Sequence, residues 1–316
     1  MRGAHWLAWR QQRTLILTAA LVLLACAAYV WFRRTEMLAF IDERHITICK
    51  GWNGGCGSQA TERLLRDNSD PIRALATLSI AFPVLIGAFW GAPLIGRELE
   101  SGTFKLALTQ GINPLRWFAA RFGLAALCSV IGSAVLAALV AWWWSPISNM
   151  LDGPYWYDGY IFNATGPAAI ACALFGLAAG TAAGLLTRRT LPAMGVALAA
   201  VAVVRLALTF VRRDWLSPTA RVTPGIVPKI PVGSAWSTGQ FGYIKPSGAE
   251  EGVMNCATSG AELKQCMAEH GYVARFHKVH PSSDFWPLQW IETAVLLSLA
   301  AALIALTVHR LRARHM

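Results

Sequence analysis

Two charged residues lie inside stretches of the sequence that are otherwise apolar. Arg205 stands near the end of the run 191–210, and Glu292 near the start of the run 286–308. If both runs are membrane helices, a rise of 1.5 Å per residue puts the two charges at a similar depth, roughly 8–9 Å from one surface. Charges inside a membrane usually pair or line a polar path. The sequence therefore favours an Arg205–Glu292 ion pair. A role along a substrate path, or separate contacts of each side chain with the membrane surface, are the alternatives.

A second group of charges lies between two apolar runs, in the segment "GRELESGTFKLALTQGINPLRW". If the N-terminus lies inside, Glu98 and Glu100 are the only acids in the inner segments between the apolar runs, which are otherwise basic. They therefore suit a directional electrostatic contact with a partner. Gly102 permits a tight turn or a helix end at this point. The segment 96–116 is too long for a simple connection, and we expect it to be a docking surface.

Catalytic and metal chemistry receive little support from the sequence. No apolar run contains an Asp in its interior, and the one candidate histidine for intramembrane chemistry, His309, lies at the end of a run. His277 and His280 have a metal-like spacing, but no Cys or carboxylate cluster completes a site nearby in the sequence. The phosphate-binding pattern GxxxxGK[ST] does not occur. We therefore expect no enzyme activity and no cofactor on this chain.

Six apolar runs must position these charges. A bilayer-spanning helix needs about 20 apolar residues, and the runs that meet this length are 14–32, 74–95, 117–144, 168–186, 191–210 and 286–308. Only 14% of the residues are charged, against about 25% in soluble domains. The sequence therefore predicts an all-α polytopic membrane protein with six transmembrane helices and a single transmembrane domain, 1–316.

Lys and Arg residues gather on one side of the predicted bundle. With the N-terminus inside, the inner segments hold twelve Lys and Arg against two acids, and the outer loops hold fifteen against fourteen. This bias places both termini and the loop 96–116 in the cytoplasm, and the loops 33–73 and 211–285 outside. The net charge of +11 is then explained by topology and by contact with anionic lipids, with no need for nucleic acid.

Glycines at four-residue spacing occur in two of the runs. Gly87 and Gly91 lie in the second run, and Gly176, Gly180 and Gly184 in the fourth. Small residues at this spacing let two membrane helices approach closely. Packing within the chain is the favoured interpretation, and a seam between two copies is the alternative.

Four cysteines fall in the outer loops. Cys49 and Cys56 lie in the first loop, and Cys256 and Cys266 in the last. Two local pairs outside the membrane predict two disulfides formed in an oxidising compartment, with unpaired surface cysteines as the alternative. We expect the outer loops to be braced by these bonds.

Short helices are also expected in these loops. The segment Thr61–Arg66 has an amphipathic pattern that precedes Pro71, and Ser259 and Glu262 have the spacing of a capping box. A helix to about His270 should follow the capping box. Neither loop is large enough for an independent apolar core, so we expect the two loops to pack on each other and on the membrane face.

The inner segment resembles the cytoplasmic loop of ABC-2-type transporter permeases, in particular of a bacterial subgroup with the pattern (R)-E-x-E-x-G-T-x-x-L-x-x-T-Q-x-x-x-x-x-R-W. The matching positions are Arg97, Glu98, Glu100, Gly102, Thr103, Leu106, Thr109, Gln110, Arg116 and Trp117. The stretches "WLAWRQQR", "VRLALTFVRR" and "HPSSDFWPLQWIETAVLL" are also similar to that subgroup, so the resemblance covers most of the chain.

The resemblance implies an ABC-2 (type V exporter-like) fold and a set of coupling residues. The family's coupling helix, carried onto this chain, includes Arg97, Glu98, Glu100, Gly102 and Thr103. The family's N-terminal interface helix would contain Trp6, Trp9, Arg10 and Arg13.

The resemblance also implies partners and a location. Two copies of an ABC nucleotide-binding subunit would carry ATP and Mg, and a second permease copy or a paralogue would complete a dimer in the bacterial plasma membrane. The implied function is export driven by that ATPase. An ABC-linked sensor without transport, and a non-ABC membrane scaffold that displays a disulfide-braced outer domain, are the alternatives.

Overall fold

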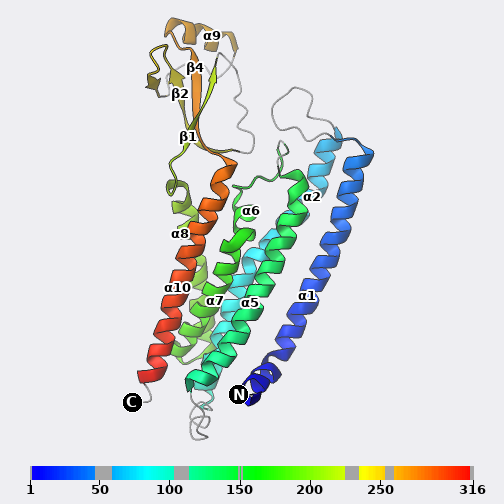
Figure 1. Cartoon of the computed structure of the whole chain (residues 1–316), viewed down its shortest axis with the longest axis vertical. Coiled ribbons are helices and arrows are strands. Elements are labelled where there is room, and N and C mark those ends of the chain that lie inside the picture. Colours follow the sequence, from blue (N-terminus) through cyan, green and yellow to red (C-terminus); the bar gives the residue numbers. More distant parts are fainter. Residues whose placement is uncertain are drawn as a thin grey trace.

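The computed structural model describes residues 2–46, 59–102, 114–148, 150, 152–224, 235–252 and 260–313. Long helices form a bundle, and a small sheet domain stands at one end of it (Figure 1). Six helical segments in the described ranges are long and apolar enough to cross a membrane. The predicted polytopic membrane architecture is therefore confirmed.

The first three spans are formed by α1 (Arg2–Glu43), by α2 (Gln59–Leu85) with the π-helical η1 (Ile86–Gly91) and α3 (Ala92–Glu100), and by α5 (Pro114–Trp144). The short η2 (Ser145–Ile147) and α6 (Gly159–Ala164) follow, and α7 (Gly166–Thr187), α8 (Thr190–Val211) and α10 (Phe285–Ala313) form the other three spans. The start of α1 and the end of α10 lie at the same end of the bundle (Figure 1). We call this the inner end, following the predicted orientation, and the opposite end the outer end.

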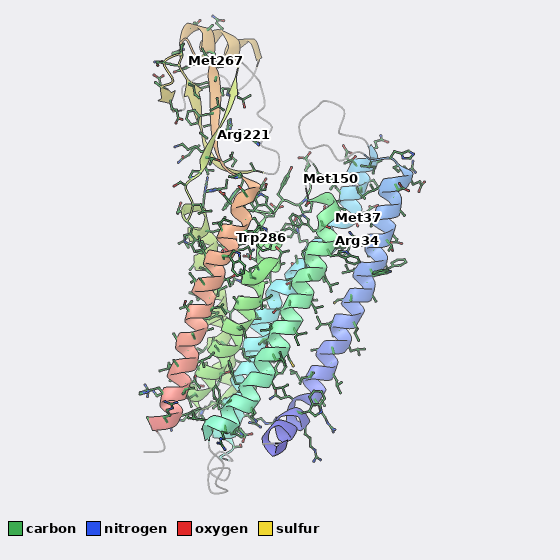
Figure 2. All side chains as sticks on the ribbon, viewed as in Figure 1. Arg34, Met37, Met150, Arg221, Met267 and Trp286 are labelled. Carbon is green, nitrogen blue, oxygen red and sulfur yellow. The ribbon has the colours of Figure 1, made fainter. Side chains whose placement is uncertain are left out.

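The boundaries of the predicted outer loop 33–73 need correction. The helix α1 continues to Glu43, and α2 begins at Gln59, so most of this segment extends the first two spans as helix. The predicted short helix Thr61–Arg66 is the beginning of α2, which runs on through Pro71. The reason is packing, because the apolar contacts continue beyond the expected span ends. Met37 and Met150 belong to the same buried cluster at the outer end (Figure 2).

The helix α7 lies at the centre of the bundle, and its three spaced glycines explain how. Most of its side chains are buried. A Cβ at Gly184 would lie 2.5 Å from the carbonyl oxygen of Ala92, and a Cβ at Gly180 would overlap the carbonyl oxygen of Gly87. From the other side, a Cβ at Gly91 would lie 2.6 Å from the carbonyl oxygen of Leu177. The two sets of glycines therefore pack α7 against the second span within one chain, as the favoured interpretation predicts.

The expectation of an all-α fold is wrong for the outer segment 211–285. Four antiparallel strands form a sheet in the order β1-β4-β2-β3, with β1 (Thr219–Pro224), β2 (Trp236–Ile244), β3 (Glu250–Glu251) and β4 (Ala274–His280). The strand β2, "WSTGQFGYI", is rich in the aromatic and β-branched residues that fit a pleated surface. The chain remains mostly helical around this insertion.

The predicted helix of the outer segment is present. It is α9 (Gly260–Glu269), and Gly271 ends it with a positive φ of 67°. Tyr243, Met267 and Tyr272 form a small buried cluster between the sheet and this helix. The outer segment therefore has a modest core of its own, which the length argument did not predict.

Aromatic side chains attach the sheet domain to the bundle. The ring of Trp236 from β2 stacks on Tyr157 at 6.3 Å and meets Trp156 edge-on at 6.2 Å. Phe285, the first residue of α10, contacts Trp156 as well. The predicted packing of the outer loops 33–73 and 211–285 on each other stays a prediction, because residues 47–58, 225–234 and 253–259 lie outside the described part of the chain.

Candidate functional site

An ion pair ties the inner end of the second span to the third. Arg121 of α5 lies 3.0 Å from Glu98 of α3, from Nη2 to Oε1, and the side chains are 11% and 24% exposed. The guanidinium of Arg121 also covers the ring of Trp117 at 4.6 Å. Because both charges are largely shielded from solvent, removing either partner would leave the other charge desolvated and unpaired at the junction of α3 and α5.

A second carboxylate ties the same helix to the fifth span. Oε2 of Glu100 accepts hydrogen bonds from the backbone N–H of Thr190 at 3.0 Å and from its hydroxyl at 2.7 Å. Thr190 is the first residue of α8, and the first N–H groups of a helix have no partner inside the helix. A carboxylate at this position also interacts favourably with the helix dipole. Glu100 therefore caps α8 from the end of α3.

Both acids of the predicted docking surface thus make contacts within the chain. Ser101 and Gly102 follow them and are exposed. Gly102 has a φ of 71°, and no atom lies within 4 Å of the place where a Cβ would be. The glycine ends the helix and turns the chain into residues 103–113. Thr103 and the rest of the coupling motif up to Asn113 lie outside the described residues.

The predicted interface helix is continuous with the first span, because α1 begins at Arg2. Figure 1 shows its first turns bending away from the axis of the rest of the helix. Trp9 is 46% exposed, and Arg10 and Arg13 are exposed too. The side chain of Trp6 lies outside the described part of the structure. The predicted interface helix is therefore the first part of α1, and its role at an interface stays a prediction.

At the outer end, the structure brings Arg205 and Glu292 together and adds a second arginine. Nη1 of Arg205 lies 3.6 Å from Oε2 of Glu292. Nε of Arg212 donates to Oε1 of the same carboxylate at 2.5 Å. Glu292 is fully buried, and the side chains of Arg205 and Arg212 are 11% and 4% exposed. The carboxylate of Glu292 therefore forms ion pairs with two arginines.

Neighbouring groups satisfy much of the remaining donor capacity of these arginines. Oδ1 of Asn163 in α6 accepts from Nη2 of Arg212 at 2.6 Å and from Nη1 of Arg205 at 3.3 Å. The guanidinium of Arg212 lies 3.8 Å above the centre of the Phe162 ring, a cation–π contact that stabilises a desolvated charge. We name Asn163, Arg205, Arg212 and Glu292 the outer charge cluster.

The outer charge cluster lies where the sheet domain joins the bundle. The chain leaves α8 through η3 (Arg212–Asp214) toward β1, and it returns from β4 through η4 (Ser282–Asp284) into α10. Gln289, one turn before Glu292, donates to the carbonyl of Phe162 at 2.8 Å and accepts from the N–H of Ala168 at 3.1 Å. The cluster and Gln289 therefore fasten α6, α7, α8 and α10 together directly beneath the sheet domain.

Sequence reasoning missed Arg212, although a signal for it exists. Arg205 and Arg212 are seven residues apart, which is two helical turns, so they lie on the same face of a continuing helix. The end of the apolar run at Phe210 suggested that Arg212 belongs to a loop. The roles of Asn163 and Arg121 depend on packing between distant segments, and the sequence carries no local signal for them.

The histidine pair and the cysteines can be placed only in part. His277 faces Phe241 in a stacked contact at 5.5 Å, and His280 contacts Asp284 at 3.0 Å. No group of three or more possible metal ligands occurs among the described residues. Cys266 of α9 is disulfide-bonded. Cys49, Cys56 and Cys256 lie outside the described residues, so the predicted pairing stays a prediction.

The comparison with known families agrees with this architecture. The family model described as ABC-2 membrane transporter related matches residues 20–213, more than half of the chain. No curated protein and no solved structure matches the chain. The matched region includes the first five spans and the inner segment between α3 and α5, whereas the sheet domain and α10 follow it. The chain therefore belongs to the ABC-2 membrane transporter related family.

Proposed function

We propose that this chain is the membrane-spanning permease subunit of an ABC exporter. A separate nucleotide-binding subunit would bind and hydrolyse ATP with Mg, and this chain would convert the resulting motion into substrate export. The observation that carries the proposal is the family match across the first five spans, together with the inner segment that begins at a defined helix end, Gly102.

The contacts around the inner segment support a coupling role for it. Glu98 joins the end of α3 to α5, and Glu100 joins it to α8. A partner that displaces residues 101–113 would therefore move the second, third and fifth spans together. The close glycine packing between α7 and the second span favours motion as a rigid unit, since packed helices resist continuous deformation. In this proposal Glu98 and Glu100 transmit the motion, Gly102 and Thr103 lie at the contact, and Arg97 belongs to the last helical turn before it.

The proposed assembly is a dimer of permeases with two ATPase subunits in the bacterial plasma membrane, with both chain ends in the cytoplasm. The support is the exposure of the first and fifth spans. The most apolar windows of α1 and α8 are 6% and 17% buried, against 83% for α7. Large side chains on these faces, such as Leu21 and Phe210, are 69% and 78% exposed. Lipid or a second copy would cover them.

The outer segment is proposed to be braced by Cys49–Cys56 and Cys256–Cys266 disulfides. The bonded state of Cys266 supports the second pair, and the first pair rests on sequence spacing. Mass measurement of peptides before and after reduction tests both pairs. A bond between Cys266 and either first-loop cysteine would contradict this arrangement.

The direct test of the proposed function is reconstitution. This chain and an ATP-binding-cassette subunit encoded beside it would be purified together and placed in liposomes. We expect a stable complex whose ATPase activity requires this chain and whose substrate moves only when ATP is present. Absence of any complex, with both subunits folded, would contradict the proposal.

One observation favours a second candidate, an ABC-linked sensor without transport. The sheet domain is inserted between α8 and α10, directly above the outer charge cluster. A ligand bound to this domain would therefore act on the helices that the cluster fastens. ATPase activity that depends on this chain, responds to an external ligand and produces no flux would favour the sensor over the exporter.

A further inference from the structure

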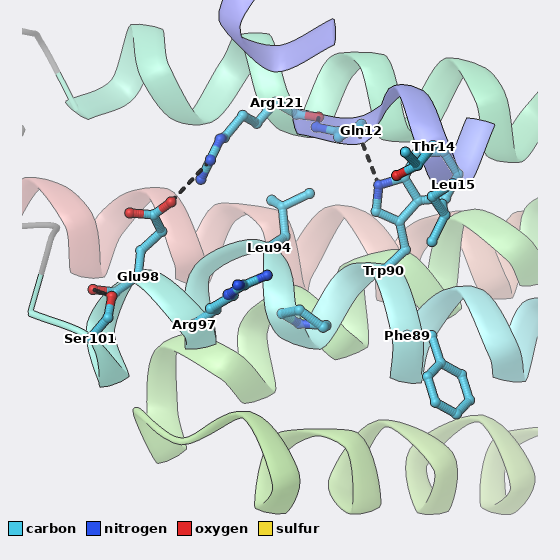
Figure 3. Close-up of a pocket in the computed structure, with 11 residues that line it drawn as sticks. Gln12, Thr14, Leu15, Phe89, Trp90, Leu94, Arg97, Glu98, Ser101 and Arg121 are labelled. Carbon is cyan, nitrogen blue, oxygen red and sulfur yellow. Dashed lines mark hydrogen bonds and ion pairs between the residues drawn. The ribbon is translucent and has the colours of Figure 1, made fainter. Parts of the chain in front are cut away.

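A groove of about 670 Å³ opens between α1, the second span and α5 near the inner end (Figure 3). Gln12 and Leu15 contribute to it from α1, Trp90 and Arg97 from the second span, and Arg121 from α5. The indole N–H of Trp90 donates to Oε1 of Gln12 at 3.0 Å. This bond joins the first and second spans across the groove, and the size of the groove suits a small ligand or a lipid headgroup.

The charged end of the groove has an excess positive charge. Arg121 is paired with Glu98, and Arg97 contributes a further guanidinium. The described part of the chain offers the Arg97 side chain no ion pair, and the side chain is exposed. Figure 3 shows it extending into the groove beside Leu94. A phosphate would satisfy such a guanidinium with charge-assisted hydrogen bonds.

The other end of the groove carries apolar side chains beside the hydrogen-bonded Gln12 and Trp90. Phe89 lies at this end and is 57% exposed, and Leu15 and Leu94 line the groove as well. Seven residues separate Trp90 from Arg97, which corresponds to about 10 Å along a helix. The groove therefore changes from a cationic to a more apolar lining over a distance comparable to that at which a phospholipid changes from headgroup to acyl chain.

We propose that this groove binds an anionic phospholipid from the inner leaflet. Arg97 would bind the phosphate, the Glu98–Arg121 pair would border the headgroup, and the acyl chain would lie against Leu15 and Phe89. A soluble anion is a poorer fit, because it would leave the apolar wall uncovered. The site adjoins the end of α3, so a bound lipid would touch the helix that precedes Gly102. The proposal depends on the groove and its charges, and it does not require an ATPase partner.

Native mass spectrometry of the purified full-length chain in a neutral detergent tests this site. The protein would be titrated with palmitoyl-oleoyl phosphatidylglycerol and, separately, with palmitoyl-oleoyl phosphatidylcholine. We expect the first phosphatidylglycerol to bind about fivefold more tightly than phosphatidylcholine, the preference that one cation near a membrane surface supplies. Arg97→Gln should abolish the preference, and Arg97→Lys should keep most of it. Arg312→Gln is the matched control, because it removes one exposed charge from the inner end of α10.

A second variant tests the shape of the groove without changing its charge. Thr14 lines the groove and is exposed, so Thr14→Trp should fill the groove and weaken the first binding event for both lipids. Equal loss of preference in Arg97→Gln and Arg312→Gln would overturn the proposal in favour of general surface charge. An unchanged preference for phosphatidylglycerol over phosphatidylcholine in Arg97→Gln would also overturn the proposal. Displacement of the lipid by millimolar inorganic phosphate would assign the site to a soluble anion instead.

Discussion

Arg212 and Glu292 form a close, buried charge contact at the outer end of the bundle, with Nε of the arginine 2.5 Å from Oε1 of the glutamate. The pair joins the end of the fifth span to the sixth, although eighty residues separate the two in sequence. Both side chains are almost completely buried. Arg205 shares the same carboxylate, so Glu292 is the common partner of two desolvated cations.

Glu292→Gln should destabilise the protein by about 3 kcal/mol, because it leaves two arginines buried without their carboxylate. Arg212→Met should lower the free energy of unfolding by a similar amount, because it leaves Glu292 with only the more distant Arg205. The measurement is the free energy of unfolding in mild detergent by titration with dodecyl sulfate. Arg213→Gln is the matched control, since Arg213 is adjacent and exposed, and its effect should stay within about 0.5 kcal/mol. Equal, small losses of unfolding free energy in all three variants would show that the outer charge cluster stabilises the protein no more than an exposed charge does.

Gly180→Ala should prevent the close contact between α7 and the second span, because the added Cβ would overlap the backbone of Gly87. Backbone cannot move aside as a flexible side chain can, so we expect a loss of about 3 kcal/mol or more, in the range of severe overpacking. Gly123→Ala in α5 meets nothing within 4 Å and should be neutral or slightly stabilising. Thermal unfolding followed by size-exclusion chromatography compares the two. A Gly180→Ala protein as stable as wild type would contradict the described packing.

The Glu98–Arg121 pair should matter for communication with the ATPase. Glu98→Ala and Arg121→Ala should each lower the ATPase activity that depends on this chain by about fivefold, an interaction of about 1 kcal/mol. The double variant should resemble either single variant, because the same contact is lost in each case. Strictly additive losses would indicate that the two residues act separately. Binding of the ATPase subunit, measured in parallel, separates failed docking from failed transmission.

The sheet domain should loosen in acid through Glu251. Hydrogen bonds from Lys245 and from Tyr272 lower the pKa of Glu251 below its ordinary value of 4.5, and the same carboxylate raises the pKa of Tyr272 to about 12. A carboxyl with a lowered folded pKa stabilises the fold above its ordinary pKa, and that contribution is lost as the pH falls through the folded value. Amide hydrogen exchange of residues 265–280, corrected for intrinsic rates, should therefore accelerate below about pH 4.5.

Glu251→Gln should remove this increase in amide exchange at low pH. The amides of the variant should already exchange faster than those of the wild type at neutral pH. Glu262→Gln is the control, because Glu262 is an exposed acid on α9 of the same domain. An acid step that persists in Glu251→Gln would assign it to another group.

The bundle could be predicted from the sequence because each span contains a long apolar run. The spaced glycines also gave the correct close packing, since their spacing is a local property of one helix. The end of α1 was placed too early and the start of α2 too late, because the outer contacts around Met37 extend both helices beyond the apolar runs. Hydrophobicity marks the lipid boundary and carries no information on where helix–helix packing stops.

The sheet domain and the contacts that Glu98 and Glu100 make within the chain could not be predicted in the same way. Strand β4 pairs with β1, about sixty residues away, as in the register Thr219–Val279, so its stability depends on distant pairing. Glu98 and Glu100 looked free because neither Arg121 nor Thr190 is near them in sequence. The charge balance correctly identified the acids as unusual, but only the fold shows that they bond to the chain itself.

The segment after α3 is proposed to contact an ATP-binding-cassette subunit, and site-specific photo-crosslinking detects such a contact. A benzophenone amino acid would replace the exposed Ser101 at the inner end or, as the control, the exposed Ser282 at the outer end. The variant at Ser101, and not the variant at Ser282, should yield a crosslinked product whose partner peptides include a phosphate-binding GxxxxGK[ST] motif. A co-expressed ATPase subunit that crosslinks at neither position, or at Ser282 alone, would contradict it.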